Sequence, residues 1–296
     1  MMARNLLVIP IFIPHEGCPF TCLFCNQHRI TGQIRPVLPE DVRATIATWL
    51  SYARLERKLE VQVAFYGGSF TGLPISRQQV LLEAVQPFLD QGLVHGIRLS
   101  TRPDYIDAER VALLRRYRVS VVELGVQSCD DAVLRRANRG HTAAAAPAAG
   151  ALLRSHGLHV GIQLMLGLPG ERFQSLRTTV KSVIALAPDF VRVYPALVLQ
   201  GSGLADLYHK GGYQPLSLGK AVVRAAWMKK RFDEHGIRVV RMGLQPTREL
   251  TESLIAGPFH PAFGELVSAR LMLQQTRQAL KSVRGGEQVA LVIAEQ

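Results

Sequence analysis

The feature that most restricts the fold of this chain is a regular alternation of short apolar runs and longer helical patterns in its first 200 residues. Each apolar run has the length of a strand, and each helical pattern is long enough to cross back over a sheet. Repeated strand-then-helix units predict a parallel sheet with crossover helices. We expect strands at Leu6–Ile13, Val61–Tyr66, Ile97–Ser100, Ser120–Val126, Val160–Leu166 and Val191–Val198, and helices near 39–58, 75–91, 107–117, 142–156 and 173–187.

The number of these units selects a particular α/β architecture. Six units in about 200 residues are too many for one half of a Rossmann fold and fewer than the eight of a closed barrel. We therefore predict a partial (β/α)6 TIM-type barrel of parallel strands over residues 1–200, with a C-terminal α/β extension over 201–296 packed on it. The extension is expected to hold helices near 217–235 and 262–283 and strands at 237–242 and 288–293.

Turn-forming or polar residues follow the predicted strands. In parallel α/β folds ligands bind at the carboxyl ends of the strands, where the loops are free to vary. The candidate binding residues therefore lie at Gly67-Gly68, Arg102-Pro103, Gln127-Ser128, Gly167–Gly170 and Tyr194-Pro195.

Three of the four cysteines are clustered on the loop after the first predicted strand. Cys18, Cys22 and Cys25 form a C-x3-C-x2-C pattern, whereas Cys129 is remote. A disulfide scaffold uses a dispersed, even set in a small secreted chain, so clustered thiols point to a metal instead. Cys129 is expected to be a small buried apolar residue.

Soft thiolate ligands leave two main candidates for that metal. A structural zinc site needs four ligands, and His15 or His28 would have to supply the fourth. A [4Fe–4S] cluster on three cysteines instead leaves one iron open for another ligand.

The cysteine string resembles that of the radical S-adenosylmethionine (SAM) enzymes, whose hallmark is C-x3-C-x2-C with an aromatic residue, here Phe24, before the last cysteine. The resemblance implies a [4Fe–4S] cluster on Cys18, Cys22 and Cys25, with SAM bound to the open iron. It also implies reductive cleavage of SAM to a 5′-deoxyadenosyl radical that abstracts hydrogen from a substrate. An external electron donor is then required.

The same resemblance assigns SAM contacts to several strand ends. Gly67, Gly68 and Ser69 stand at the family's Gly-Gly motif, although the family often has glutamate at the third position. Gln127 and Ser128 stand where the family contacts the SAM ribose, and Tyr194 faces the adenine. Arg102 is a candidate for a carboxylate, with a salt bridge as its plain alternative. The SAM-binding set is Phe24, Gly67, Gly68, Ser69, Arg102, Gln127, Ser128 and Tyr194.

One further residue is expected inside the barrel. Glu123 alternates in phase with Gly125 and Gln127 along its strand, so its carboxylate points inward and needs a partner such as Arg192. A structural ion pair and a SAM contact both remain open for it.

Longer strings narrow the resemblance to the radical SAM domain of the Elongator catalytic subunit, which modifies wobble uridines of tRNA. They are Pro14–Cys18, Thr101–Tyr105, Glu123–Ser128, Asn138–Thr142 and Arg192–Pro195. The Glu123–Ser128 string is also similar to oxygen-independent coproporphyrinogen oxidases. Elongator-type enzymes carry a further acetyltransferase domain, which 296 residues are not expected to accommodate. A separate acetyltransferase is therefore a candidate partner.

Charge adds a second indication of the partner. Lys and Arg total 35 against 23 Asp and Glu, a net charge of +12 spread along the chain, which favours an anionic partner such as tRNA or other RNA. No apolar run approaches the roughly 20 residues of a membrane span, so we expect no membrane segment and a cytoplasmic location. A non-catalytic RNA-binding relative with a structural cluster, and a zinc-stabilised barrel, remain the alternatives.

Overall fold

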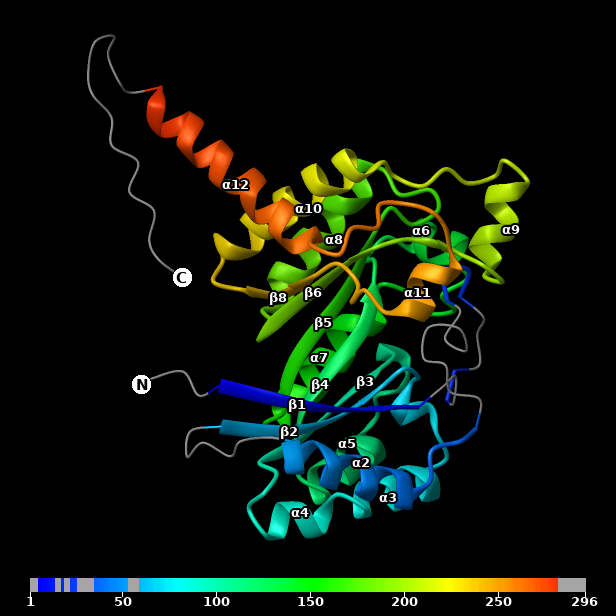
Figure 1. The fold of residues 1–296 in the computed structure, drawn as a ribbon, viewed down its shortest axis with the longest axis vertical. Helices are drawn as coiled ribbons and strands as arrows, with labels where there is room; N and C mark the ends of the chain where they lie inside the picture. Colours follow the sequence, from blue (N-terminus) through cyan, green and yellow to red (C-terminus); the bar gives the residue numbers. More distant parts are fainter. Residues whose placement is uncertain (1–4, 14–16, 19–21, 26–34, 53–58, 282–296) are drawn as a thin grey trace.

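The computed structural model describes residues 5–13, 17–18, 22–25, 35–52 and 59–281. Seven parallel strands form one curled sheet in the order β1-β2-β3-β4-β5-β6-β8 (Figure 1). The strands are Asn5–Phe12 (β1), Leu59–Tyr66 (β2), Gly96–Thr101 (β3), Val119–Gln127 (β4), His159–Leu166 (β5), Phe190–Pro195 (β6) and Arg238–Met242 (β8).

Helices return the chain between successive strands and pack on the outside of the curl. Contacts pair α2 with β1, α5 with β4, α7 with β4 and β5, and α10 with β5 and β8. The helices of the first 200 residues are Pro39–Tyr52 (α2), Ile75–Glu83 (α3), Gln86–Asp90 (α4), Ala108–Arg116 (α5), Asp131–Arg136 (α6), Ala145–Ser155 (α7) and Phe173–Leu186 (α8), with 3-10 turns at Phe70–Gly72 (η1) and Pro103–Tyr105 (η2).

The remaining residues add helices at one end of the sheet. Helix α12 packs on α10, and its far end projects from the body (Figure 1). A second, two-stranded sheet pairs β7 with β9 in antiparallel fashion. These elements are Val198–Leu199 (β7), Gly203–His209 (α9), Leu218–Asp233 (α10), Arg248–Ser253 (α11), Leu254–Ala256 (β9) and Phe263–Leu280 (α12).

The core lies between the sheet and its outer helices. Apolar strand residues such as Ile9, Val63 and Leu99 are fully buried there with Leu82 and Phe232 from the helices. The strands read as nearly continuous apolar runs because a parallel sheet is covered on its outer face and curled on its inner one. Among the described residues, no helix has the length and apolar composition needed to cross a membrane.

The predicted open α/β barrel is confirmed, and it holds one strand more than the six expected. Strand β8, predicted as part of the extension, pairs in parallel with β6 and continues the sheet. The predicted helix over 75–91 is divided into α3 and α4, because Pro87, in the first turn of α4, lacks the N–H that would continue the preceding helix. The predicted strand over 191–198 ends at Pro195, after which β7 pairs with β9. The strand expected at 288–293 lies outside the described residues.

The loop after β5 is tied to the later part of the chain through a buried carboxylate. Glu171 Oε1 accepts hydrogen bonds from the Gly167 backbone N–H at 2.9 Å and from Arg224 Nη1 at 3.1 Å, and its side chain is 2% exposed. The Tyr213 hydroxyl donates to the Gly167 carbonyl at 2.7 Å. Burial raises the pKa of Glu171 from 4.5 to about 7 against the opposing effect of these donors.

This raised pKa predicts a pH-dependent stability. Between about pH 4.5 and 7 the folded protein retains a proton on Glu171 that the unfolded chain releases, so its contribution to the free energy of unfolding falls as pH rises through that window. Glu171→Gln keeps an acceptor for both donors and should remove that part of the pH dependence. Urea unfolding at several pH values measures it, with the exposed Glu249→Gln as control. Parallel profiles for Glu171→Gln and the wild type would contradict the prediction.

Candidate functional site

A cavity of about 670 Å³ opens at the carboxyl ends of the strands. Its walls come from β1 to β6, from the cysteine loop, and from β8 and the segment that follows it. Ligands of parallel α/β folds bind at this edge of the sheet. Nine of the residues predicted for the site line this one cavity: Cys18, Cys22, Phe24, Cys25, Gly67, Gly68, Arg102, Gln127 and Tyr194.

Two predicted residues, Ser69 and Ser128, lie behind the wall instead. The Ser69 hydroxyl is 2.9 Å from that of Thr101, and it accepts a hydrogen bond from the Arg102 backbone N–H at 3.2 Å. The Ser128 hydroxyl is 3.3 Å from that of Thr179 on α8 and accepts from the Asp130 backbone. Both side chains hold strand ends in place, which is an ordinary loop-capping role.

The cysteine loop is anchored to the body on both sides of Leu23. The Leu23 backbone donates to the Ala137 carbonyl at 3.1 Å, and its own carbonyl accepts from the Leu204 backbone at 2.7 Å. The Cys22 thiol, buried at 5% exposure, lies 3.4 Å from Arg139 Nη1. Burial raises the pKa of the Cys18 thiol, while the charges of Arg139 and Arg102 and the Ser69 backbone act to lower it.

Two glycines allow this loop to sit against the η1 turn. Gly17 has a φ of +76°, and a Cβ added to it would collide with the Ser69 carbonyl oxygen. A Cβ on Gly72 would collide with the Gly17 carbonyl oxygen. Because both obstacles are backbone atoms, neither position accepts a side chain without moving the loop that carries Cys18.

The lining fits the predicted iron–sulfur cluster and SAM in its donor chemistry. Three thiols are soft ligands for iron, and the guanidinium of Arg139 lies beside the Cys22 sulfur. The amide oxygen of Gln127 is buried with no hydrogen-bond partner among the described residues, an acceptor ready for a ligand hydroxyl. The described residues hold no preformed group of three or more metal-ligating side chains. His15 and His28, the candidates for a fourth zinc ligand, lie outside them.

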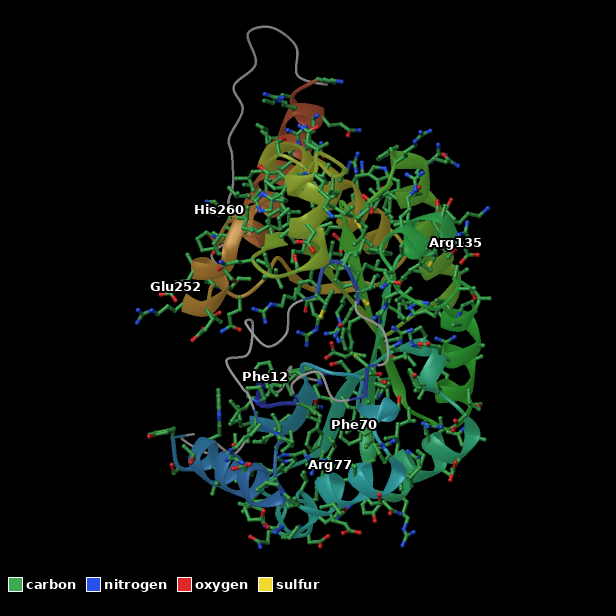
Figure 2. The ribbon with its side chains drawn as sticks, turned by 90° about the vertical axis from the view of Figure 1, so that its right-hand side faces the viewer. Phe12, Phe70, Arg77, Arg135, Glu252 and His260 are labelled. Atoms are coloured by element: carbon green, nitrogen blue, oxygen red, sulfur yellow. The ribbon has the colours of Figure 1, made fainter. Side chains whose placement is uncertain are left out.

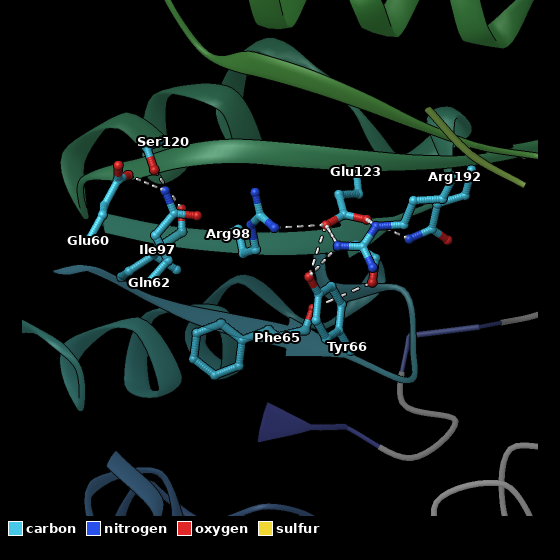
Figure 3. Close-up of polar contacts among 11 residues, drawn as sticks. Glu60, Gln62, Phe65, Tyr66, Ile97, Arg98, Ser120, Glu123 and Arg192 are labelled. Atoms are coloured by element: carbon cyan, nitrogen blue, oxygen red, sulfur yellow. Dashed lines mark hydrogen bonds and ion pairs between the residues drawn. The ribbon is translucent and has the colours of Figure 1, made fainter. Parts of the chain in front are cut away.

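Beneath the cavity lies the inward carboxylate that the strand periodicity predicted. Glu123 is fully buried, and its ion pair with Arg192, Nε to Oε2 at 2.8 Å, confirms the expected partner (Figure 3). The Tyr66 hydroxyl donates to Oε1 at 2.9 Å, Gln163 Nε2 to Oε2 at 3.0 Å, and Arg98 Nη1 lies 3.6 Å from Oε1. Burial, and next the Glu123 charge, raise the pKa of Tyr66 to about 12, so its hydroxyl remains a donor.

Arg102 forms the salt bridge that was considered as its alternative role, and it also lines the cavity as predicted. Its guanidinium is 2% exposed and holds Asp104 in a two-pronged pair, Nε to Oδ1 at 2.9 Å and Nη2 to Oδ2 at 2.7 Å. The pair is buried on the arginine side, unlike an ordinary surface salt bridge, and Arg102 still lines the cavity.

Sequence reasoning missed several polar residues of the lining, among them Arg139, Gln163 and Arg241. Arg139 ends an arginine-rich string, residues 135–139, that is typical of a solvated helix face, yet it is buried and donates to the Gly125 carbonyl at 2.6 Å. Gln163 is the one polar residue in the apolar run predicted as a strand at 160–166, which was a usable signal because inward positions alternate with period two. Arg241 carried no such signal, because its strand was not expected in this sheet.

The half-barrel and its thiol-lined cavity define a class of protein in which an α/β barrel holds a metal cofactor at the carboxyl ends of its strands. The model of the radical SAM superfamily matches residues 12–183, more than half of the chain, and that of a radical SAM C-terminal domain matches residues 188–273. The chain belongs to the radical SAM superfamily. This membership makes it an enzyme of that class and supports both predicted cofactors, the [4Fe–4S] cluster and SAM.

Individual relatives bear out the narrower resemblance to Elongator. A tRNA uridine(34) acetyltransferase of Methanocaldococcus jannaschii is 31% identical over 264 residues, 76% of this chain and 49% of that protein. Protein YhcC of Escherichia coli K12 is 27% identical over 212 residues, 70% and 66% of the two chains. The archaeal Elp3 of Methanocaldococcus infernus shares the fold, with a TM-score of 0.71 and 20% identity over 92% of this chain and 64% of that one. The chain spans about half the length of the acetyltransferases it matches.

Removing the Glu123 carboxylate should destabilise the fold. Glu123→Ala leaves Arg98 and Arg192 as buried cations without a carboxylate, which costs about 3–5 kcal/mol in comparable cases. Denaturant unfolding measures the loss, and Glu252→Ala, which removes an exposed ion pair with Arg248, should leave the midpoint unchanged. A Glu123→Ala protein as stable as the wild type would refute a structural role for the pair.

Crowding the anchor of the cysteine loop should impair cofactor loading without touching the cavity. In Gly72→Ala the new Cβ displaces the Gly17 carbonyl and with it Cys18, so we expect clearly less iron per chain after reconstitution. Gly219→Ala, where a Cβ meets open space in α10, is the matched control and should load as the wild type does. Equal iron contents in the two variants would contradict the anchoring role.

Proposed function

We propose that Cys18, Cys22 and Cys25 bind a [4Fe–4S] cluster and that the chain reductively cleaves SAM. The observation that carries the proposal is that the three thiols, Gly67-Gly68 and Gln127 all line one cavity, and that the Gln127 amide oxygen has no hydrogen-bond partner among the described residues. When bound, the cluster supplies the electron that cleaves SAM to a 5′-deoxyadenosyl radical, which abstracts hydrogen from the substrate.

The residues of the chain have distinct tasks in this proposal. Arg139 compensates thiolate charge beside Cys22, and Arg102, held by Asp104, presents a fixed cation to the cavity. Glycines at 67 and 68 let the backbone approach the SAM amino group closely. Gln127 accepts a hydrogen bond from a hydroxyl of the SAM ribose through its amide oxygen, which has no partner among the described residues. Phe24 and Tyr194 supply apolar and aromatic surface to the cofactor.

For the substrate we propose a uridine of tRNA. The support is the similarity to proteins named tRNA uridine(34) acetyltransferase, together with the net charge of +12. An external reductant is a required partner, and a separate acetyltransferase is a proposed second one. Analysis of nucleosides from total tRNA incubated with the reduced enzyme and SAM would test the substrate.

The cofactor proposal is tested by anaerobic reconstitution of cysteine variants. The wild type should bind about four irons per chain and form 5′-deoxyadenosine from SAM with dithionite, and Cys22→Ala should lose both. Cys129→Ala is the matched control, since Cys129 is a buried thiol with a pKa raised to about 12 by burial and its backbone N–H bonds to Thr179 away from the cavity. Iron content and mass spectrometry of nucleosides give the readout. A protein that retains zinc instead of iron would overturn the proposal.

A further inference from the structure

The cavity also carries charged side chains on β6 and β8 to which the cofactor proposal gives no role. Arg192 on β6 and Arg241 on β8 are paired in the register of the two neighbouring strands, and both line the cavity. Like charges on directly opposed residues of a sheet repel each other. Two guanidinium groups side by side therefore need a compensating anion.

The described residues supply only part of that anion. Glu123 is the one carboxylate in contact with Arg192, and it also faces Arg98. Arg241 donates to the neutral amide oxygen of Gln245 at 3.3 Å, and it forms no ion pair among the described residues. Glu123 thus contacts two guanidinium groups and Arg241 adds a third, so the three arginines and one carboxylate carry an excess of two positive charges.

The other residues of the cavity lining do not neutralise this excess of positive charge. Among the described residues, the lining holds four arginines and no aspartate, glutamate or lysine. Arg102 has its own carboxylate in Asp104, and Arg139 lies beside Cys22. Burial raises the pKa of Tyr194, whose hydroxyl is bonded to Arg192 and affected by Arg241, so it offers no negative charge. An anionic ligand would supply the remaining negative charge.

An aromatic wall belongs to the same cavity. Phe12 on β1 and Trp49 on α2 line it, and each is 39% exposed, which is high for large aromatic side chains. Figure 2 shows Phe12 between the level of α2 and that of α11, which carries the labelled Glu252. Aromatic faces at an open site bind flat rings by stacking. Thr247, the N-cap of α11, and Leu250 in the first turn of that helix also line the cavity.

We propose that Arg192 and Arg241 bind a phosphate of the substrate RNA while Phe12 and Trp49 stack on an unpaired base of the same strand. This assignment rests on the proposed function and names the residues that select its substrate. A nucleotide unit matches the site because it combines a flat ring with an adjacent anion. The ring is then held inside the cavity that the three thiols also line.

The test measures RNA binding by the cluster-loaded enzyme without reductant, so it does not depend on radical chemistry. The probe is a fluorescein-labelled RNA hairpin with a seven-nucleotide loop and a uridine at the loop centre. Arg241→Gln should weaken binding roughly tenfold, the loss expected for one charge-assisted contact, and reduce the salt slope by about 0.7. Arg238→Gln, on the exposed part of the same strand and outside the lining, should bind as the wild type does.

The aromatic wall is tested with a second pair of variants. Trp49→Ala should weaken binding of the uridine hairpin and leave binding of an otherwise identical hairpin with an abasic loop centre unchanged. Tyr52→Ala, one turn along α2, 80% exposed and outside the lining, is its control. Equal losses for Arg241→Gln and Arg238→Gln, or for the two hairpins with Trp49→Ala, would overturn the inference. Loss of 5′-deoxyadenosine formation with RNA binding intact would instead reject the proposed function.

Discussion

The structure depends on one buried carboxylate at the centre of an open barrel. Glu123 on β4 contacts Tyr66 from β2, Arg98 from β3, Gln163 from β5 and Arg192 from β6, so side chains of five successive strands meet at one group. A closed barrel fills its interior with layers of apolar side chains. A half-barrel that keeps a cavity cannot be filled in this way, and a polar network centred on Glu123 joins the strands there instead.

This network also lies directly beneath the cavity. It forms the floor from which Tyr66, Gln163 and Arg192 rise into the lining. The same lining holds the thiols with Arg139 and the paired guanidinium groups of β6 and β8. Because the floor carries a single carboxylate, our proposals assign the remaining negative charge to what binds there, a cluster with SAM beside the thiols and a substrate anion beside the paired arginines.

Features of this structure that depend on local interactions could be predicted from the sequence, and features that depend on contacts between distant segments could not. Strand positions depend on local periodicity, and all six predicted barrel strands are present. The Glu123–Arg192 pair was also within reach, since period two places Glu123 inward and a buried carboxylate demands a cation. The addition of β8 to the sheet could not be predicted from the sequence, because the pairing of β8 with β6 depends on contacts between segments far apart in the chain. Arg139 was missed because its burial also depends on long-range packing. The sequence of an arginine-rich string does not show whether its last residue faces water or a thiol.

Irregularities in the sheet show that the backbone itself is adapted to the site. The register shifts between Ile97 and Arg98, between Gly125 and Gln127, and between Val191 and Arg192. Each shift directly precedes a residue of the polar floor or the cavity lining. Gln127 even adopts a φ of +68°, which costs a residue with a side chain on the order of 1 kcal/mol. Bulges re-aim side chains at the expense of ladder hydrogen bonds. Their coincidence with Arg98, Gln127 and Arg192 indicates that the direction of these three side chains, more than regular strand pairing, is what this part of the sheet maintains.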